Sequence, residues 1–350
     1  MKKKIAVGLS GGIDSSFAAY LLKKEGWDVI GFTLKFYPEE NRCCDLDSLY
    51  QAQRLCDNLK IPHYVIDVGE IFKKEIIEYF IGSYIRGLTP NPCAFCNRLI
   101  KFGCFLEKVR SFGIDYLATG HYAKVVKENN SFFLKRAKDE KKSQEYFLSL
   151  INPDALKNLI FPLADFTKEE VKKIARKEKV MFKERKESQD ICFVREKSYI
   201  EFIENSIPLT QEYRGNIKHV SGDILGRHAG IYYFTCGQRE GLGVSWKEPL
   251  YVIDIDAENK TIVVGEKKYL SKDRFMVSSL NWFILPAKCS GIKVKIRYNS
   301  PFYECRIEPR EDKVLVLLKN KVDAVTPGQV AAFYDHDTLI GGGIIEKSIK

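Results

Sequence analysis

The sequence predicts an α/β fold: a parallel-sheet N-terminal domain, then a small central domain and a C-terminal β-barrel. Its 350 residues exceed what one hydrophobic core usually organises. Up to about residue 120, short β-branched runs alternate with amphipathic helical stretches, which is typical of a parallel sheet covered by helices. After about residue 215, short spaced strand patterns indicate small barrels. We therefore expect domains at 1–205, 206–270 and 271–350.

Each predicted element follows from a local pattern. In the N-terminal part the strand patterns cover Ile5–Leu9, Val29–Lys35, Tyr64–Val68 and Tyr116–Thr119, and the helical patterns cover Ser15–Glu25, Leu46–Leu59 and Leu99–Phe112. Residues 140–205 are helical in pattern and strongly charged, with Thr167 as an N-cap before the acidic pair Glu169–Glu170. Later strand patterns cover Tyr251–Asp256, Thr261–Val264, Lys293–Tyr298, Phe302–Ile307, Val314–Leu318 and Val330–Tyr334. We expect Gly341–Gly343 to lie in a close-packed strand rather than in a binding loop.

Composition limits the function classes. The formal net charge is +10, which favours a polyanionic partner. Nowhere do about 18 uninterrupted apolar residues occur, which excludes a membrane-spanning helix. Glycines and Asp14 interrupt the early apolar run, so it does not resemble an export signal. We expect a cytoplasmic protein whose ten cysteines are mostly reduced, some of them serving chemistry.

A glycine-rich turn directly follows the first predicted strand and opens a helix. Its sequence is Ser10-Gly11-Gly12-Ile13-Asp14-Ser15. Such a turn directs backbone N–H groups at a phosphate. The order of residues differs from a Walker loop and from Gly-x-Gly-x-x-Gly. It is similar to that of the PP-loop ATP pyrophosphatases, a family with a Rossmann-like sheet. The resemblance implies that ATP is split to AMP and pyrophosphate, with Mg²⁺ accompanying the phosphates, and that a substrate oxygen is adenylated.

A Cys-x-x-Cys pair, Cys93 and Cys96, lies in the proline-rich segment Thr89–Asn97. The pair has three interpretations: half of a zinc site, a dithiol redox pair, or part of an iron–sulfur site. Zinc needs a second ligand pair, and none stands at metal-site spacing. We expect a helix over Arg98–Val109, whose dipole, with Arg98 and Lys101, makes Cys96 nucleophilic at neutral pH. Cys192, taken alone, is typical of a core cysteine.

Six sequence blocks together resemble the bacterial tRNA-specific 2-thiouridylases, and they span the whole chain. They are Ser10–Ser15, Thr89–Asn97, Ala118–Tyr122, Ser188–Phe193, Gly237–Gly243 and Thr326–Gln329. The resemblance implies ATP-dependent 2-thiolation of a tRNA wobble uridine, with sulfur supplied by a cysteine desulfurase or relay protein. It makes Cys96 the nucleophile and Cys192 the persulfide carrier.

The same resemblance assigns binding residues. For ATP they are Gly8, Leu9, Ser10, Gly11, Gly12, Ile13, Asp14, Ser15, Leu34 and Gly120. For tRNA they are Asn91, Pro92, Cys93, His121, Lys142, Ser143, Gln144, Arg297, Tyr298 and Gln329.

Two positions depart from the family pattern. Cys93 stands where some members have an acidic residue with a proton-transfer role, and Ser143 also replaces an acidic residue. Cys93, Cys96 and Cys192 together are therefore an alternative ligand set for an iron–sulfur cluster. No metal ligand is otherwise predicted. Two rival functions stay open: a PP-loop enzyme that forms amides on a small carboxylate, and a nucleotide-gated RNA-binding or redox module without turnover.

Overall fold

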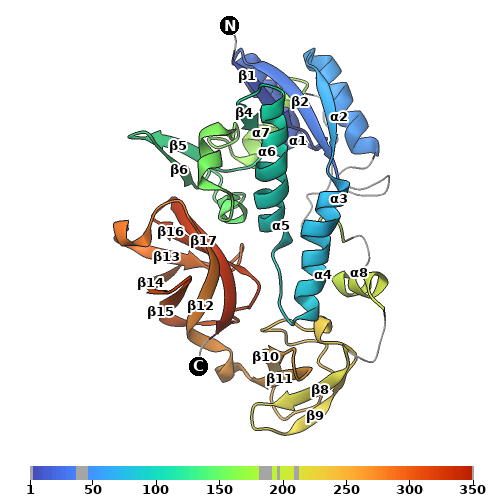
Figure 1. Cartoon of the computed structure of the whole chain (residues 1–350), viewed down its shortest axis with the longest axis vertical. Coiled ribbons are helices and arrows are strands. Elements are labelled where there is room, and N and C mark those ends of the chain that lie inside the picture. Colours follow the sequence, from blue (N-terminus) through green and yellow to red (C-terminus); the bar gives the residue numbers. More distant parts are fainter. Residues whose placement is uncertain (1–2, 37–45, 181–190, 195–197, 209–212, 349–350) are drawn as a thin grey trace. The chain divides into compact units, whose positions relative to one another are not determined.

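The computed structural model describes residues 3–36, 46–180, 191–194, 198–208 and 213–348 (Figure 1). The chain divides into two compact units. One comprises Met1–Ile76, Cys93–Arg195 and Asp337–Leu339, and the other comprises Ile77–Pro92, Glu196–His336 and Ile340–Lys350. This division does not test the predicted domain boundaries, which stay predictions. Among the described residues, no helix has the length and apolar character needed to cross a bilayer.

The first unit is organised around a sheet in the order β3-β2-β1-β4-β7. Its strands are β1 (Lys4–Gly8), β2 (Asp28–Lys35), β3 (His63–Asp67), β4 (Tyr116–Ala118) and β7 (Leu159–Ile160), and every neighbouring pair is parallel. The central strand β1 buries Ile5, Ala6 and Val7 completely, as expected for a strand covered on both faces. The predicted parallel sheet is confirmed.

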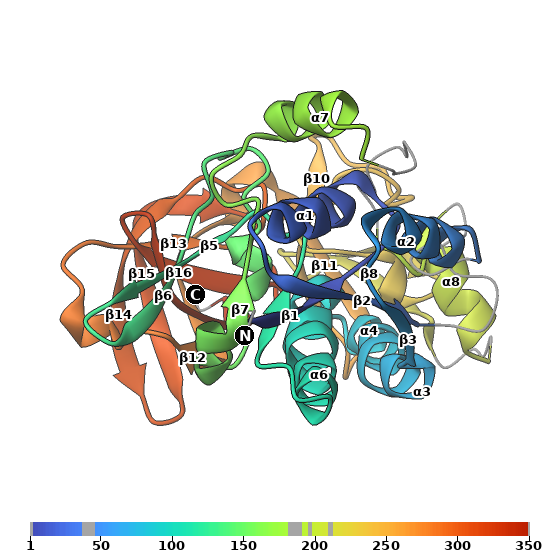
Figure 2. The ribbon, with the colours of Figure 1, turned by 90° about the horizontal axis from the view of Figure 1, so that it is seen from above.

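Helices α1 (Ile13–Lys24) and α2 (Leu46–Leu59) cover one face of this sheet, and α6 (Phe105–Ser111) covers the other (Figure 2). Helix α7 (Lys168–Lys177) packs on α1, where Val171 and Ala175 join the core formed by Phe17 and Ala18. Thr167 caps α7: its hydroxyl accepts from the Glu170 N–H, and the Glu170 carboxylate accepts from the Thr167 N–H. The predicted N-cap is confirmed.

The helix that carries Cys96 begins earlier than expected. Helical structure starts with α5 (Pro92–Phe95), continues as a π-helical segment over Cys96–Cys104, and ends with α6. The expected start at Arg98 was wrong because proline, which lacks an N–H, is well accommodated in a first helical turn. Cys96 consequently lies inside the helix and not in front of it. The π-helical hydrogen bond from Phe105 N–H to Ile100 O is of the kind often found at functional sites.

Several elements have no counterpart among the sequence predictions. In the first unit, β5 (Lys124–Glu128) and β6 (Ser131–Lys135) form a hairpin, and β6 also pairs with Thr338 and Leu339. Helix α3 (Gly69–Phe72) precedes a π-helical stretch over Lys73–Ile77, and α4 (Glu78–Ile85) follows it.

The second unit holds a small sheet and a barrel. The small sheet has the order β10-β11-β8-β9 and consists of β8 (Gly215–His219), β9 (Ile224–His228), β10 (Leu250–Asp256) and β11 (Thr261–Glu266), with α8 (Tyr199–Ser206) preceding it in the chain. The barrel has the order β12-β15-β14-β13-β16-β17 and is closed by pairing of β12 with β17. Its strands are β12 (Ser271–Trp282), β13 (Ile292–Lys295), β14 (Tyr303–Arg310), β15 (Lys313–Asp323), β16 (Val330–Asp335) and β17 (Thr338–Ser348).

Gly341 and Gly343 lie in β17, as expected. A Cβ atom on Gly341 would stand 2.4 Å from Asn281 O, so only glycine fits against the neighbouring strand. The barrel core contains Phe275, Val316 and Phe333, all fully buried. The predicted fold class, a parallel-sheet α/β domain followed by a central domain and a C-terminal barrel, is confirmed.

Candidate nucleotide and cysteine site

The turn between β1 and α1 is braced by its own hydroxyl groups. Ser15 Oγ accepts from the Ser10 N–H and donates to Gly12 O, both at 3.1 Å, and Ser16 Oγ donates to Gly12 O at 2.9 Å. Gly11 has φ +72°, and a Cβ atom there would stand 2.9 Å from Ser48 O. A residue with a side chain would be strained in this conformation and would clash with α2. The loop is therefore held in one shape before any ligand arrives.

A cavity of about 210 Å³ opens beside this loop, and all the residues that line it belong to the first unit. The loop contributes Gly8, Leu9, Ser10, Asp14 and Ser15 to the lining. The aromatic and aliphatic side chains of Phe32, Leu34, Phe36 and Phe105 form another wall. The remaining lining residues are Lys101, Thr119, Gly120, His121 and Gln144. Phosphate-binding backbone next to an apolar wall suits a nucleotide, with the base against the apolar wall.

Seven of the ten predicted ATP residues line this cavity, and the other three, Gly11, Gly12 and Ile13, lie within the same loop. Gly120 follows β4, and a Cβ atom there would stand only 2.6 Å from Ser15 N. Gly120 therefore allows the end of β4 to approach the loop closely. The position is at the carboxyl ends of parallel strands, where open α/β sheets bind ligands.

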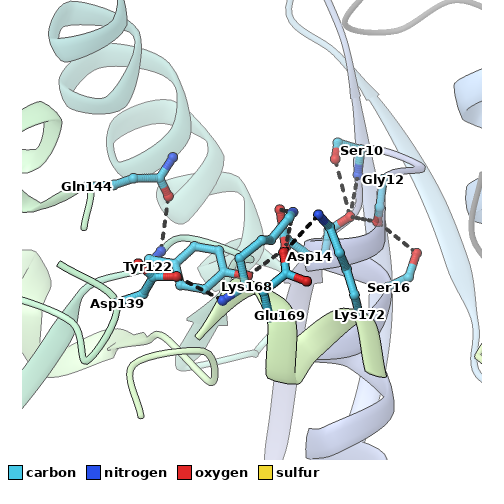
Figure 3. A network of polar contacts seen from close by, with 11 residues as sticks. Ser10, Gly12, Asp14, Ser16, Tyr122, Asp139, Gln144, Lys168, Glu169 and Lys172 are labelled. Atoms are coloured by element: carbon cyan, nitrogen blue, oxygen red, sulfur yellow. Dashed lines mark hydrogen bonds and ion pairs between the residues drawn. The ribbon is translucent and has the colours of Figure 1, made fainter. Parts of the chain in front are cut away.

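Asp14 is held by two side chains from outside the loop (Figure 3). Lys168 Nζ donates to both Asp14 oxygens, at 2.7 and 2.6 Å, and Tyr122 Oη donates to Asp14 Oδ1 at 2.8 Å. The Lys168 side chain is only 9% exposed, and its backbone N–H donates to Asp139 Oδ2. Lys168 was not among the site residues predicted from the sequence. Its only local signal is its place after the N-cap Thr167, which says nothing of a partner on a distant loop.

Three cysteines lie close together in the first unit, although Cys192 is far from the others in sequence. Cys192 is near enough to Cys93 and Cys96 for its charge to affect both thiols. Burial raises the pKa of Cys96 to about 12, against the lowering effect of the Lys101 charge. Cys93 reaches solvent, yet the protein packed around it raises the pKa of its thiol to about 11, and Cys192 adds to this effect.

The prediction that Cys96 is nucleophilic at neutral pH is therefore wrong, because burial keeps its thiol protonated there. Cys96 is 8% exposed, and the cost of burying a thiolate exceeds the stabilisation from Lys101. Arg98 lies on the exposed side of the helix and does not contribute to the pKa of Cys96. A nucleophilic role for Cys96, which stays a prediction, therefore requires activation of its thiol.

The iron–sulfur alternative finds no support in the described residues. Every cysteine there is reduced, and no three His, Cys, Asp or Glu side chains are arranged to hold a metal ion, including the set Cys93, Cys96 and Cys192.

Two of the predicted tRNA residues of the first unit, His121 and Gln144, line the cavity. His121 lines the cavity and shares a 2.7 Å hydrogen bond with Thr119 Oγ1, and burial lowers the pKa of its imidazole well below the usual value. Gln144 also lines the cavity, and its Oε1 accepts from the Tyr122 N–H at 3.0 Å. Lys142 is half-buried, whereas Ser143 is buried and its hydroxyl bonds the Ala137 N–H and Glu145.

The other predicted tRNA residues belong to the second unit, where two of them make structural contacts. Gln329 Nε2 donates to Thr89 O and Pro90 O, at 2.9 and 3.2 Å, and thereby joins two sequence blocks. The Arg297 guanidinium donates to Cys236 O, Ala324 O and Thr326 Oγ1. Asn91 and Pro92 are buried. The Lys295 ammonium lies 5.6 Å from the centre of the Tyr298 ring. Contact of these residues with tRNA stays a prediction.

Comparison with known proteins identifies the family. Family models match three consecutive parts of the chain: the tRNA methyl transferase HUP domain over residues 3–196, the tRNA methyl transferase PRC-barrel domain over 200–266, and the Aminomethyltransferase beta-barrel domain over 272–345.

Curated relatives match over the full length. The tRNA-specific 2-thiouridylase MnmA of Aquifex aeolicus is 46% identical, covering 99% of this chain and 100% of that protein. The tRNA-specific 2-thiouridylase MnmA 1 of Caldanaerobacter subterraneus subsp. tengcongensis is 40% identical, covering 100% of both. A solved structure, a predicted subunit of tRNA methyltransferase from Methanocaldococcus jannaschii, is 18% identical over 50% of this chain and 74% of that chain. Its TM-score is 0.33, and no conclusion about function is drawn from it. The full-length identities establish that this chain belongs to the tRNA-specific 2-thiouridylase family.

Proposed function

We propose that this protein is a tRNA-uridine 2-sulfurtransferase, which converts the wobble uridine of tRNA to 2-thiouridine with consumption of ATP. The observation that carries the proposal is the grouping, in one compact unit, of the cavity beside the loop Ser10–Ser15 and the reduced cysteines Cys96 and Cys192. Full-length similarity to proteins named tRNA-specific 2-thiouridylase supports the same activity. The reaction belongs to the cytoplasm, where tRNA is available and thiols stay reduced.

ATP activates the substrate in the first step. The C2 carbonyl oxygen of uridine is a poor leaving group, and its attack on the α-phosphate of ATP releases pyrophosphate and leaves AMP on that oxygen. The loop N–H groups from Ser10 to Ser15 and the N-terminus of the 12-residue helix α1 bind the phosphates. Phe32, Leu34 and Phe105 supply the apolar wall for the base.

Among the described residues that line the cavity, none offers an unoccupied carboxylate to Mg²⁺. Asp14 is the carboxylate among the described lining residues, and both of its oxygens already accept hydrogen bonds from Lys168. We therefore route no step through a protein-bound metal ion, and we place Mg²⁺ with the ATP phosphates as part of the substrate.

Sulfur transfer forms the second step. The terminal sulfur of a Cys192 persulfide bonds to C2, and the C2–O bond breaks as AMP leaves. The Cys96 thiolate then attacks the Sγ atom of Cys192. The Cys192 S–S bond breaks, its electron pair stays on the sulfur at C2, and a Cys96–Cys192 disulfide forms. Two electrons from a thiol reductant restore both cysteines, and a cysteine desulfurase or relay protein reloads Cys192.

The tRNA must present one base outside its stack. The uridine leaves the anticodon stack to reach the cavity, as base-modifying enzymes generally require. His121 and Gln144 line the cavity and would contact the flipped nucleotide. The other residues proposed to contact tRNA are Asn91, Pro92, Cys93, Lys142, Ser143, Arg297, Tyr298 and Gln329. The net charge of +10 favours binding of the phosphate backbone.

Three alternative functions predict different reactants and products. An amide-forming PP-loop enzyme needs neither Cys192 nor tRNA, and an RNA-binding or redox module consumes no ATP when tRNA is added. The words methyl transferase in the family descriptions suggest a third alternative, which needs a methyl donor and leaves uridine oxygen in place.

Single cysteine variants test the proposal. Cys96→Ser and Cys192→Ser should each abolish 2-thiouridine, measured by mass spectrometry of tRNA nucleosides after incubation with ATP and a sulfur donor. Cys104→Ser is the matched control, because Cys104 ends the same π-helical segment and its thiol donates to the Ile100 carbonyl of that segment. Full activity in Cys96→Ser or Cys192→Ser would refute the two-cysteine scheme.

A further inference from the structure

A carboxylate in a phosphate-binding cavity poses an electrostatic problem. Asp14 lines the cavity, its side chain is 32% exposed, and it lies in the first turn of α1. A bare carboxylate at this place would repel the polyphosphate of ATP. Some positive charge must therefore offset Asp14 before ATP can bind well.

Lys168 supplies that charge. Its ammonium group contacts both oxygens of Asp14, at 2.7 and 2.6 Å, and it also lies 6.0 Å from the centre of the Tyr122 ring, whose hydroxyl binds the same carboxylate (Figure 3). The Lys168 side chain is 9% exposed, so this pair is poorly screened by solvent.

The placement of Lys168 is fixed independently of Asp14. Lys168 is the first residue of α7, directly after the N-cap Thr167, which forms a capping box with Glu170. Its own N–H donates to Asp139 Oδ2 at 2.9 Å, and the remainder of α7 packs on α1 through Val171 and Ala175. Contacts of α7 that do not involve Asp14 therefore hold the ammonium group beside the loop.

We propose that Lys168 is an affinity determinant for ATP. The positive charge of Lys168 neutralises the Asp14 carboxylate in place of a metal ion. Asp14 therefore does not repel the triphosphate. The inference rests on the proposed use of ATP and adds a residue to it. Because the role is electrostatic, removing both charges should restore much of what removing Lys168 alone destroys.

The test is ATP binding measured by calorimetry, without tRNA, on full-length variants. Lys168→Met should weaken ATP binding about 10- to 100-fold, because it leaves Asp14 uncompensated next to the phosphates. Lys168→Arg, which keeps the charge, should lose far less. The double variant Lys168→Met/Asp14→Asn should bind ATP more tightly than Lys168→Met does. Raised Mg²⁺ should partly rescue Lys168→Met, because a divalent cation can take the vacated place beside the carboxylate.

Lys172→Met is the matched control. Lys172 lies one turn further along α7 and is paired with Glu169 at 3.2 Å, but its side chain is 38% exposed and does not line the cavity (Figure 3). This variant should bind ATP as the unsubstituted protein does. If Lys168→Met does not fold, as judged by thermal melting, Lys168→Gln replaces it, because glutamine keeps a hydrogen-bond donor without the charge.

Two results would overturn the inference: unchanged ATP affinity in Lys168→Met, or a double variant that binds no better than Lys168→Met. The second result would mean that Lys168 only supports the loop or that Asp14 is itself needed to hold a metal ion. The binding assay contains no tRNA and is therefore independent of thiolation. A protein that binds ATP normally but does not thiolate tRNA would count against the proposed function and leave this inference intact.

Discussion

The reactivity of Cys96 gives a quantitative prediction, in which pH is the perturbation. Burial raises the pKa of Cys96 to about 12 in the ligand-free protein, whereas an unperturbed cysteine has a pKa of about 8.5. A group whose pKa is raised in this way stays a neutral thiol through the physiological range. The thiolate fraction then rises about tenfold for each pH unit between pH 7 and 10 and reaches no plateau there.

The expected rate follows from these two values. The gap of about 3.5 pH units lowers the thiolate population roughly 2,400-fold at pH 8. A more basic thiolate is also more nucleophilic, with a Brønsted slope of about 0.4–0.5, which recovers a factor of about 25–55. Alkylation of Cys96 should therefore be about 40- to 100-fold slower than that of a free cysteine, before any steric protection by its 8% exposure.

The assay is alkylation by iodoacetamide at several pH values, with the modified residue identified by peptide mass spectrometry. The same protein in guanidinium chloride is the matched control, because unfolding removes the burial and should restore an ordinary pH profile. A Cys96 rate that levels off below about pH 8.5 in the folded protein, or that equals the unfolded rate, would refute the reasoning.

Three further predictions concern the same unit. Lys101→Met should slow alkylation of Cys96 several-fold at pH 8, because it removes the charge that lowers the pKa of Cys96, while Lys101→Arg should not; equal rates in all three proteins would contradict this. Gly11→Ala should weaken ATP binding at least about tenfold in calorimetry, because φ is +72° and the added methyl meets Ser48 O. Gly26→Ala, at a residue with φ +89° that does not line the cavity, is the control and should leave ATP binding unchanged. Thr167→Ala should lower the free energy of unfolding by about 1 kcal/mol in chemical denaturation, because it breaks the capping box, and an unchanged midpoint would show that the cap is dispensable.

Much of the fold was predictable because it depends on local patterns. The strands β1, β2 and β3 follow from β-branched runs, and the cap of α7 follows from Thr167 with the acidic residues after it. The early start of the helix at Pro92 was missed because prolines indicate an extended segment as readily as a first helical turn. Strands such as β8 and β9 were missed because their polar and glycine-containing sequences become strands only through pairing with neighbours.

The site was predictable in its chemistry but not in its electrostatics. The order of glycines, serines and Asp14 is enough to indicate a phosphate loop, and the structure places a cavity beside it. The high pKa of Cys96 depends on burial by distant parts of the chain, which no local pattern reveals. Lys168 was missed for the same reason, since its pairing with Asp14 joins residues that only the tertiary fold brings together.

A single-turnover experiment tests the central claim, that Cys96 and Cys192 act together on an adenylated uridine. The protein is loaded with persulfide on Cys192, freed of excess sulfur donor and reductant, and mixed with ATP and tRNA. The account predicts one Cys96–Cys192 disulfide, detected by peptide mass spectrometry, for each 2-thiouridine and each pyrophosphate formed. Formation of 2-thiouridine with both cysteines still reduced would contradict it.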